Sequence, residues 1–125
     1  MLPHLSSMNI TGAIRLSFIP LLTTASAGCS NVSVDVERGR QLAQQYQCGT
    51  CHVIPGADAA NGTVAITLES FGLRSYIAGR IPNTDENLAR WIVDPPALIP
   101  GTLMPSMGVT PDDARAIAAY LRQLR

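Results

Sequence analysis

Apolar residues recur every three to four positions in three segments of the chain, and this spacing predicts three amphipathic helices. The first helix is predicted over residues 36–48, with Asp35 as its N-cap. Its apolar face comprises Leu42, Ala43 and Tyr46. Gly39, near the start of this helix, fits either a close crossing by another helix or simple tolerance close to a helix end.

The second helix is predicted over residues 85–93, with Thr84 as its N-cap. The two prolines that follow Asp94 should end it, because proline restrains the residue before it and cannot extend the hydrogen-bond ladder. The third helix is predicted over residues 111–123, where Thr110 is the N-cap and a proline takes the first helical position. The predicted buried faces contain Leu88, Trp91 and Ile92 in the second helix and Ala114, Ile117, Leu121 and Leu124 in the third.

The pattern contains no convincing strand. Residues 64–68 have strand propensity but lack an obvious partner, and a short helical turn is indicated around residues 75–78. We therefore expect an all-α domain with short helices and long loops.

The first 28 residues have the features of an export signal. Arg15 precedes an apolar run at residues 16–22, and Ala25-Ser26-Ala27 supplies the small residues of a cleavage site. Residues 16–28 are only thirteen in number and include Pro20, whereas a membrane span needs roughly 20 apolar residues. We therefore expect residues 1–28 to be a signal peptide, whether translation starts at Met1 or at Met8.

Cys29 follows Ser26-Ala27-Gly28, which resembles the lipobox of bacterial lipoproteins, although that pattern prefers leucine at the position of Ser26. The alternative is cleavage after Ala27, which would leave Cys29 as a lone thiol in an oxidising compartment. We expect lipidation at Cys29 and a lipoprotein anchored on the periplasmic side of a membrane. Residues 29–34 are then a short linker, and residues 35–125 form one domain.

The charged residues exclude some classes of partner. All nine basic residues are arginines, and removing Arg15 with the signal leaves eight against nine carboxylates, a net charge of −1. A lysine ring that could steer the protein to acidic partners is therefore absent. Nucleic acid is not an expected partner, because there is no basic patch with interleaved aromatic residues.

The run Cys48-Gly49-Thr50-Cys51-His52 has the clearest chemistry in the chain. Two thiols three positions apart can each add to one vinyl group of a haem, and the following histidine can then coordinate the iron. A structural zinc site needs four ligands, and the other candidates, Cys29 and His4, lie in or beside the export signal. A thioredoxin-type dithiol would follow a strand, whereas a helix is predicted here. We expect one haem c, bound covalently through both cysteines.

The second axial ligand must come from a different residue type, because His52 is the only histidine after the signal. Met104 and Met107 are the soft ligands available, although core filling is the ordinary role of a methionine. Met104 lies in a proline-bounded loop, residues 100–105, that can hold its thioether rigidly. We therefore expect Met104 to bind the iron.

The order of these features resembles a class I cytochrome c over essentially the whole chain after the signal. It comprises Gly39-x-x-Leu42, the Cys48-to-His52 run, Gly-Thr-Leu-Met-Pro at residues 101–105 and a last helix with Ala119-Tyr120-Leu121. The segment RIPNTDENLARWI, residues 80–92, is similar to the haem domain fused to subunit II of some bacterial cytochrome oxidases. The copper-binding domain and membrane helices of that subunit are missing from this sequence.

The resemblance implies a small class I cytochrome c fold, with three to four helices wrapped around one covalently bound haem. It implies that His52 and Met104 are the axial ligands. It also implies that the first and last helices cross near Gly39 and Tyr120.

Further residues are assigned roles around the haem. The resemblance implies that Trp91 packs by the haem propionates, although a simple core role is the more ordinary one for a tryptophan. Arg74 and Arg80 are candidate propionate partners, with solvent exposure as the alternative. The family commonly has Gly-Pro-x-Leu after the haem motif, where the proline carbonyl orients the axial histidine. This chain has Ala-Ile-Thr-Leu at residues 65–68, and the Ile66 carbonyl could take the same role.

These features predict an exported monohaem c-type cytochrome that carries single electrons in a respiratory chain and is not itself an enzyme. The expected partners are a terminal oxidase or dehydrogenase and the membrane surface. One alternative is a haem c subunit of a larger oxidase or dehydrogenase complex. Another is a five-coordinate haem sensor or peroxidase with Met104 displaced, but a peroxidase would want a distal acid–base group, and no second histidine can supply it.

Overall fold

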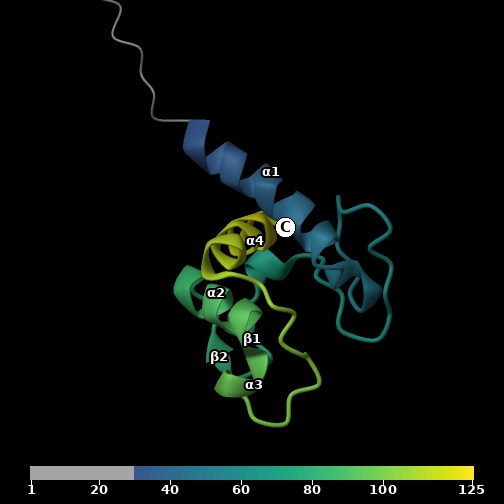
Figure 1. Ribbon diagram of the computed structural model, residues 1–125, viewed down its shortest axis with the longest axis vertical. Coiled ribbons are helices and arrows are strands. Elements are labelled where there is room, and N and C mark those ends of the chain that lie inside the picture. Colours follow the sequence, from purple (N-terminus) through teal and green to yellow (C-terminus); the bar gives the residue numbers. More distant parts are fainter. Residues whose placement is uncertain (1–29) are drawn as a thin grey trace, which may run out of the picture.

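The computed structural model describes residues 30–125, so the predicted signal peptide and the lipidation site at Cys29 lie outside the described residues. The described chain is mostly helical, and α4 lies between α1 and α2 (Figure 1). The four helices are α1 Ser30–Gln45, α2 Asp85–Val93, α3 Pro95–Leu98 and α4 Pro111–Gln123. None of them is long and apolar enough to span a membrane.

The predictions for the second and third helices are confirmed. Helix α2 is capped by the Thr84 hydroxyl, which accepts a hydrogen bond from the backbone N–H of Asn87. Helix α4 is capped in the same way by Thr110, which accepts from the N–H of Asp113. The predicted apolar faces are buried, except that Leu124 is only partly buried.

The boundaries predicted for the first helix are wrong. Helix α1 begins at Ser30, and Asp35 is an exposed residue within it instead of an N-cap. Neither proline nor glycine interrupts the chain between these two positions, so the helix extends toward the N-terminus. At the other end α1 stops at Gln45, because Gln47 takes a left-handed backbone conformation with φ of 56°.

The structure contains a hairpin and a short helix that the sequence pattern did not predict. The prediction of a helical turn at residues 75–78 is wrong. This segment contains the first strand of an antiparallel hairpin, which pairs β1 Tyr76–Ile77 with β2 Ile81–Pro82. Gly79 in its turn has φ of 70°, which glycine adopts without strain. The prolines after Asp94 do end α2, but they also begin the short helix α3. As predicted, residues 64–68 form no strand.

Helices α1 and α4 cross in close contact, as the resemblance implies. A Cβ added to Gly39 would overlap the carbonyl oxygen of Ala116 and come within 2.9 Å of Tyr120 Cβ. Of the two explanations for Gly39, a close helix crossing and simple tolerance near a helix end, the structure supports the close crossing.

Polar contacts flank this crossing. The Tyr46 hydroxyl donates a hydrogen bond of 2.8 Å to Asp113 Oδ2, and Arg38 forms an ion pair with the same carboxylate. The hydrogen bond from Tyr46 is the main cause that lowers the pKa of Asp113, and it also raises the pKa of Tyr46. The contacts join the middle of α1 and the residue that follows it to the first turn of α4.

Replacement of Gly39 by alanine is predicted to lower the free energy of unfolding by about 2 kcal/mol, because the added methyl group forces α1 away from α4. Urea unfolding followed by far-ultraviolet circular dichroism measures this change. Gln45→Ala, an exposed substitution in the same helix, is the control and should change the free energy by less than about 0.5 kcal/mol. Equal stability of the Gly39→Ala variant and the unmodified protein would contradict the close crossing.

Replacement of Asp113 by asparagine is predicted to destabilise the protein at neutral pH, with a difference that shrinks as the pH falls below about 4. The fold lowers the pKa of Asp113, so its ionised form stabilises the folded state above the unfolded pKa. That contribution is lost as the pH drops through the lowered, folded-state pKa.

Urea unfolding at a series of pH values measures the effect. Asp112→Asn is the matched control, because the ion pair of Asp112 with Arg115 is highly exposed and should contribute little at any pH. A difference for Asp113→Asn that grows on acidification would disprove the proposed linkage.

Candidate functional site

The two cysteines and the histidine of the motif lie on one helical turn directly after α1. The left-handed Gln47 ends the turn that follows α1, and Cys48–Thr50 forms a 3₁₀ helix. The backbone N–H groups of Cys51 and His52 both donate to the carbonyl oxygen of Cys48, at 3.3 and 3.1 Å. The turn therefore brings both thiols and the imidazole close together on one hydrogen-bonded segment.

The surroundings of the cysteines do not favour the two alternative uses of this spacing. Both are free thiols, and burial raises the pKa of Cys48, whereas a catalytic dithiol needs a lowered one. Zinc binding is not supported either, because residues 30–125 contain no group of three or more His, Cys, Asp or Glu side chains that could hold a metal ion.

The ring of His52 is oriented by a backbone carbonyl. Its Nδ1 lies 2.7 Å from the carbonyl oxygen of Ile66, which confirms the contact expected at this position. A carbonyl can only accept, so this hydrogen bond requires a proton on Nδ1, and in the neutral ring the lone pair of Nε2 is then free. His52 is thus prepared to act as a metal ligand through Nε2.

The loop that supplies Ile66 is held against the motif by backbone hydrogen bonds. Three N–H groups of the loop donate to carbonyls of the motif and the residue after it, at 2.8 to 3.0 Å. These pairs are Gly62 to Gly49, Ala65 to Cys51 and Leu68 to Val53. The carbonyl of Ile66 is therefore fixed relative to His52 by its neighbours on both sides.

Two glycines that the motif does not single out make this packing possible. A Cβ on Gly49 would lie 2.5 Å from Ala60 Cα, and a Cβ on Gly62 would overlap the carbonyl oxygen of Thr50. The only sequence signal for this contact is the presence of glycine, which does not indicate its partner.

Met104 and Met107 differ in burial. Both lie in the loop of residues 99–110 that follows α3. Met104 is partly buried and packs against the same core that Cys48 contacts, whereas Met107 is 45% exposed. This difference agrees with the choice of Met104 as the predicted ligand.

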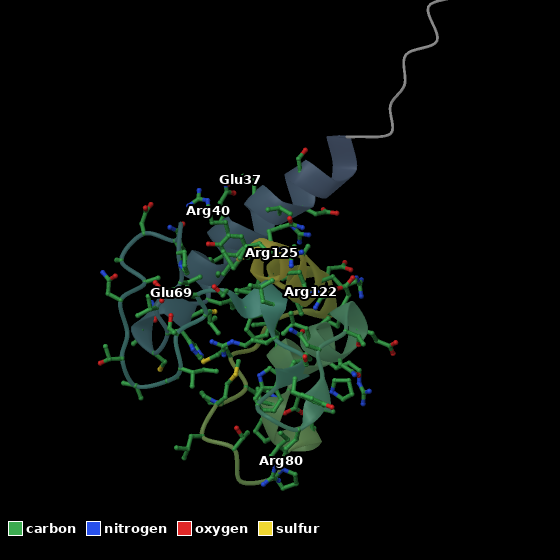
Figure 2. The ribbon with its side chains drawn as sticks, turned by 180° about the vertical axis from the view of Figure 1, so that it is seen from behind. Glu37, Arg40, Glu69, Arg80, Arg122 and Arg125 are labelled. Atoms are coloured by element: carbon green, nitrogen blue, oxygen red, sulfur yellow. The ribbon has the colours of Figure 1, made fainter. Side chains whose placement is uncertain are left out.

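The remaining predicted site residues are not all brought together. Trp91 on α2 is 7% exposed and belongs to the core. The Arg74 guanidinium donates to the Thr67 carbonyl at 2.6 Å, next to the residue that contacts His52, and stacks over Phe71. Arg80 is exposed at the tip of the hairpin, at the opposite end of the molecule from α1 (Figure 2).

Asn83 supports this region, although no motif points to it. Its Nδ2 donates to the carbonyl oxygen of Arg74 at 2.9 Å, and its own carbonyl accepts from Arg122 of α4 at the same distance. Asn83 therefore connects the segment that carries Arg74 to the last helix.

The donor set fits a covalently attached haem. Two free thiols stand on one turn with an imidazole whose Nε2 is available, and a thioether is held in a separate loop against the core. Soft thioether and imidazole donors are the axial ligands of cytochromes c.

Comparisons with known proteins agree with this chemistry. The cytochrome c family model matches residues 36–125. Cytochrome c-552 of Bradyrhizobium diazoefficiens is 31% identical over 105 residues, which cover 84% of this chain and 89% of that protein. Cytochrome c oxidase subunit 2 of Alkalihalophilus pseudofirmus is 39% identical over 89 residues, which cover 70% of this chain and 25% of that protein.

A second oxidase subunit matches a similar share of this chain. Cytochrome c oxidase subunit 2 of Bacillus subtilis is 28% identical over 93 residues, 71% of this chain and 26% of that protein. The chain therefore spans about a quarter of the length of these subunit 2 relatives. No solved structure gives a significant match. The predicted similarity to oxidase subunit II and the predicted fold class are both confirmed.

Proposed function

The chain belongs to the cytochrome c family as a class I member, and we propose that it is an exported monohaem electron carrier of a respiratory chain. The observation that carries the proposal is the 2.7 Å contact of His52 Nδ1 with the Ile66 carbonyl, which frees Nε2 for a metal ion. A bound haem would supply one iron that takes up and releases a single electron.

Different residues of the site are proposed to attach the haem and to bind its iron. Cys48 and Cys51 would hold it through thioether bonds, and His52 and Met104 would bind its iron. The Ile66 carbonyl keeps the imidazole in one tautomer and one orientation. With both residues bound, the iron would keep no open coordination position, which would favour electron transfer over catalysis on a bound substrate.

Three further side chains are proposed to surround the propionates. Arg74 is supported by its position, because it is fixed beside the loop that orients His52. The burial of Trp91 in the core fits simple packing equally well, so its proposed contact rests on the family resemblance. Arg80 is exposed on the hairpin, so its proposed contact rests on the family resemblance alone.

We also propose that Cys29 carries lipid and holds the protein on the periplasmic side of a membrane, near a terminal oxidase or dehydrogenase. The multiple acyl chains of a bacterial lipoprotein would give firm attachment. A second candidate function is a haem subunit of a larger oxidase complex, and the 39% identity to an oxidase subunit 2 favours it. Proteins that co-purify from detergent-solubilised membranes distinguish a complex subunit from a free carrier.

Replacement of Met104 by alanine is predicted to abolish the far-red sulfur-to-iron absorption band and to allow carbon monoxide to change the reduced spectrum, because the sixth ligand is lost. Met107→Ala is the matched control and should retain both the band and a reduced spectrum unmoved by the gas. Absorption spectra of the purified proteins measure both properties.

The outcomes separate the hypotheses. A band that survives in Met104→Ala but is lost in Met107→Ala would assign the ligand to Met107. Rapid carbon monoxide binding by the unmodified protein at neutral pH would reject the six-coordinate carrier in favour of a five-coordinate sensor or peroxidase.

Replacement of Cys29 by serine is predicted to abolish incorporation of labelled palmitate, because the thiol is the proposed acceptor. Ser26→Leu is the control; it brings the preceding residues closer to the lipobox pattern and should preserve labelling. Metabolic labelling and the mass of the mature protein measure the result. An unlabelled native protein whose mass corresponds to cleavage after Ala27 would disprove lipidation.

A further inference from the structure

The loop of residues 99–110, which carries Met104, has few packing contacts with the rest of the described chain. None of residues 100–108 is buried, and Val109, at 5% exposure, is the buried residue of the loop. Gly101 and Gly108 flank Met104 with φ of 82° and 71°, and a Cβ added to either glycine would have open space around it. Apart from the partial packing of Met104 itself, burial therefore does little to fix the stretch between these glycines.

One hydrogen bond joins this stretch to another part of the protein. In the described chain, the backbone N–H groups of Thr102 and Met104 donate to acceptors within the loop, at 3.1 and 3.4 Å. The Ser106 hydroxyl instead donates to Oδ1 of Asp94, at 2.8 Å. Ser106 lies two residues beyond Met104, so this hydrogen bond holds the chain close to the proposed ligand.

Asp94 is a well-fixed acceptor for this hydrogen bond. It lies between α2 and α3, and its backbone N–H donates to the Arg90 carbonyl of α2 at 3.1 Å. The next residue, Pro95, is fully buried and begins α3. Because a proline also restricts the backbone of the residue before it, Asp94 is constrained from both sides. The hydrogen bond therefore ties the loop to the junction of two helices.

We propose that Asp94 and Ser106 are positioning residues, whose hydrogen bond keeps the thioether of Met104 within reach of a haem iron. This inference rests on the proposed function, because it requires Met104 to be an axial ligand. Contacts behind a metal ligand orient it, and a hydrogen bond to a carboxylate is among the stronger ones in proteins. Without it, the stretch between Gly101 and Gly108 opens more often, and the thioether leaves the iron more often.

The experiment titrates the oxidised, haem-loaded, full-length protein with imidazole, which binds the iron only when the thioether has left it. Loss of the far-red sulfur-to-iron band gives the apparent Kd, which falls in proportion as the open population rises. Ser106→Ala and Asp94→Ala are each expected to lower this Kd about tenfold, because each removes a hydrogen bond to a charged group. The double substitution should lower it no further than either single one, because both remove the same bond.

Two further variants separate the hydrogen bond from other effects. Asp94→Asn removes the charge but keeps an oxygen acceptor, so it should lower the Kd by only about threefold, since neutral hydrogen bonds are roughly half as strong. Ser70→Ala is the matched control, because Ser70 is exposed and its side chain caps no helix; its Kd should stay within about twofold of the unmodified value.

Equal Kd values in Ser106→Ala and Ser70→Ala would overturn the proposal, as would an effect of Asp94→Asn as large as that of Asp94→Ala. Additive effects in the double variant would do the same, because the two residues would then act separately. If the unmodified protein lacked the far-red band, the assignment of Met104 and the six-coordinate carrier would fail as well. A normal band with unchanged sensitivity to imidazole would reject the positioning role alone.

Discussion

The close crossing of α1 and α4 at Gly39 is the contact on which the candidate site depends. Because no side chain separates the helices there, the end of α1 is brought to the side of α4, and the motif turn follows immediately. Helix α4 also contacts the segment after the motif, since the Tyr120 hydroxyl donates to the Pro55 carbonyl. At its far end, the Leu124 carbonyl accepts from Gly72, in the segment that leads to Arg74.

The irregular loop after the motif obtains its order from backbone hydrogen bonds and from glycine. Gly49 and Gly62 let two stretches of backbone approach more closely than any side chain would permit, and the resulting hydrogen bonds fix the Ile66 carbonyl. Because the contact with His52 is made by a backbone oxygen, the side chain at position 66 is free to face solvent. This explains how the role assigned to proline in the related pattern can be taken by isoleucine.

The sequence predicts features whose causes are local. Helices α2 and α4 were predicted correctly because threonine caps and prolines act within a few residues. The motif turn is equally local, so its ligands can be named from spacing. The hairpin leaves no signal in the sequence, because strands of two residues have no alternation to detect. Helix α3 is equally hidden, because proline after a helix marks its end as readily as the start of another. The contact between Gly49 and Ala60 depends on the folded chain and cannot be derived from either segment alone.

The distribution of charge separates the helices that maintain the fold from the loops that carry the proposed iron ligands. Ion pairs join α1 to α4 and α4 to α2, where they support packing that the apolar core already determines. The ligand-bearing loops have almost no charge, so contacts at the site depend on shape and apolar burial. Apolar surroundings disfavour any additional net charge, and oxidation of a bound haem would add one positive charge. This absence of charge would therefore favour the reduced state of the proposed cofactor, in the same direction as a methionine ligand.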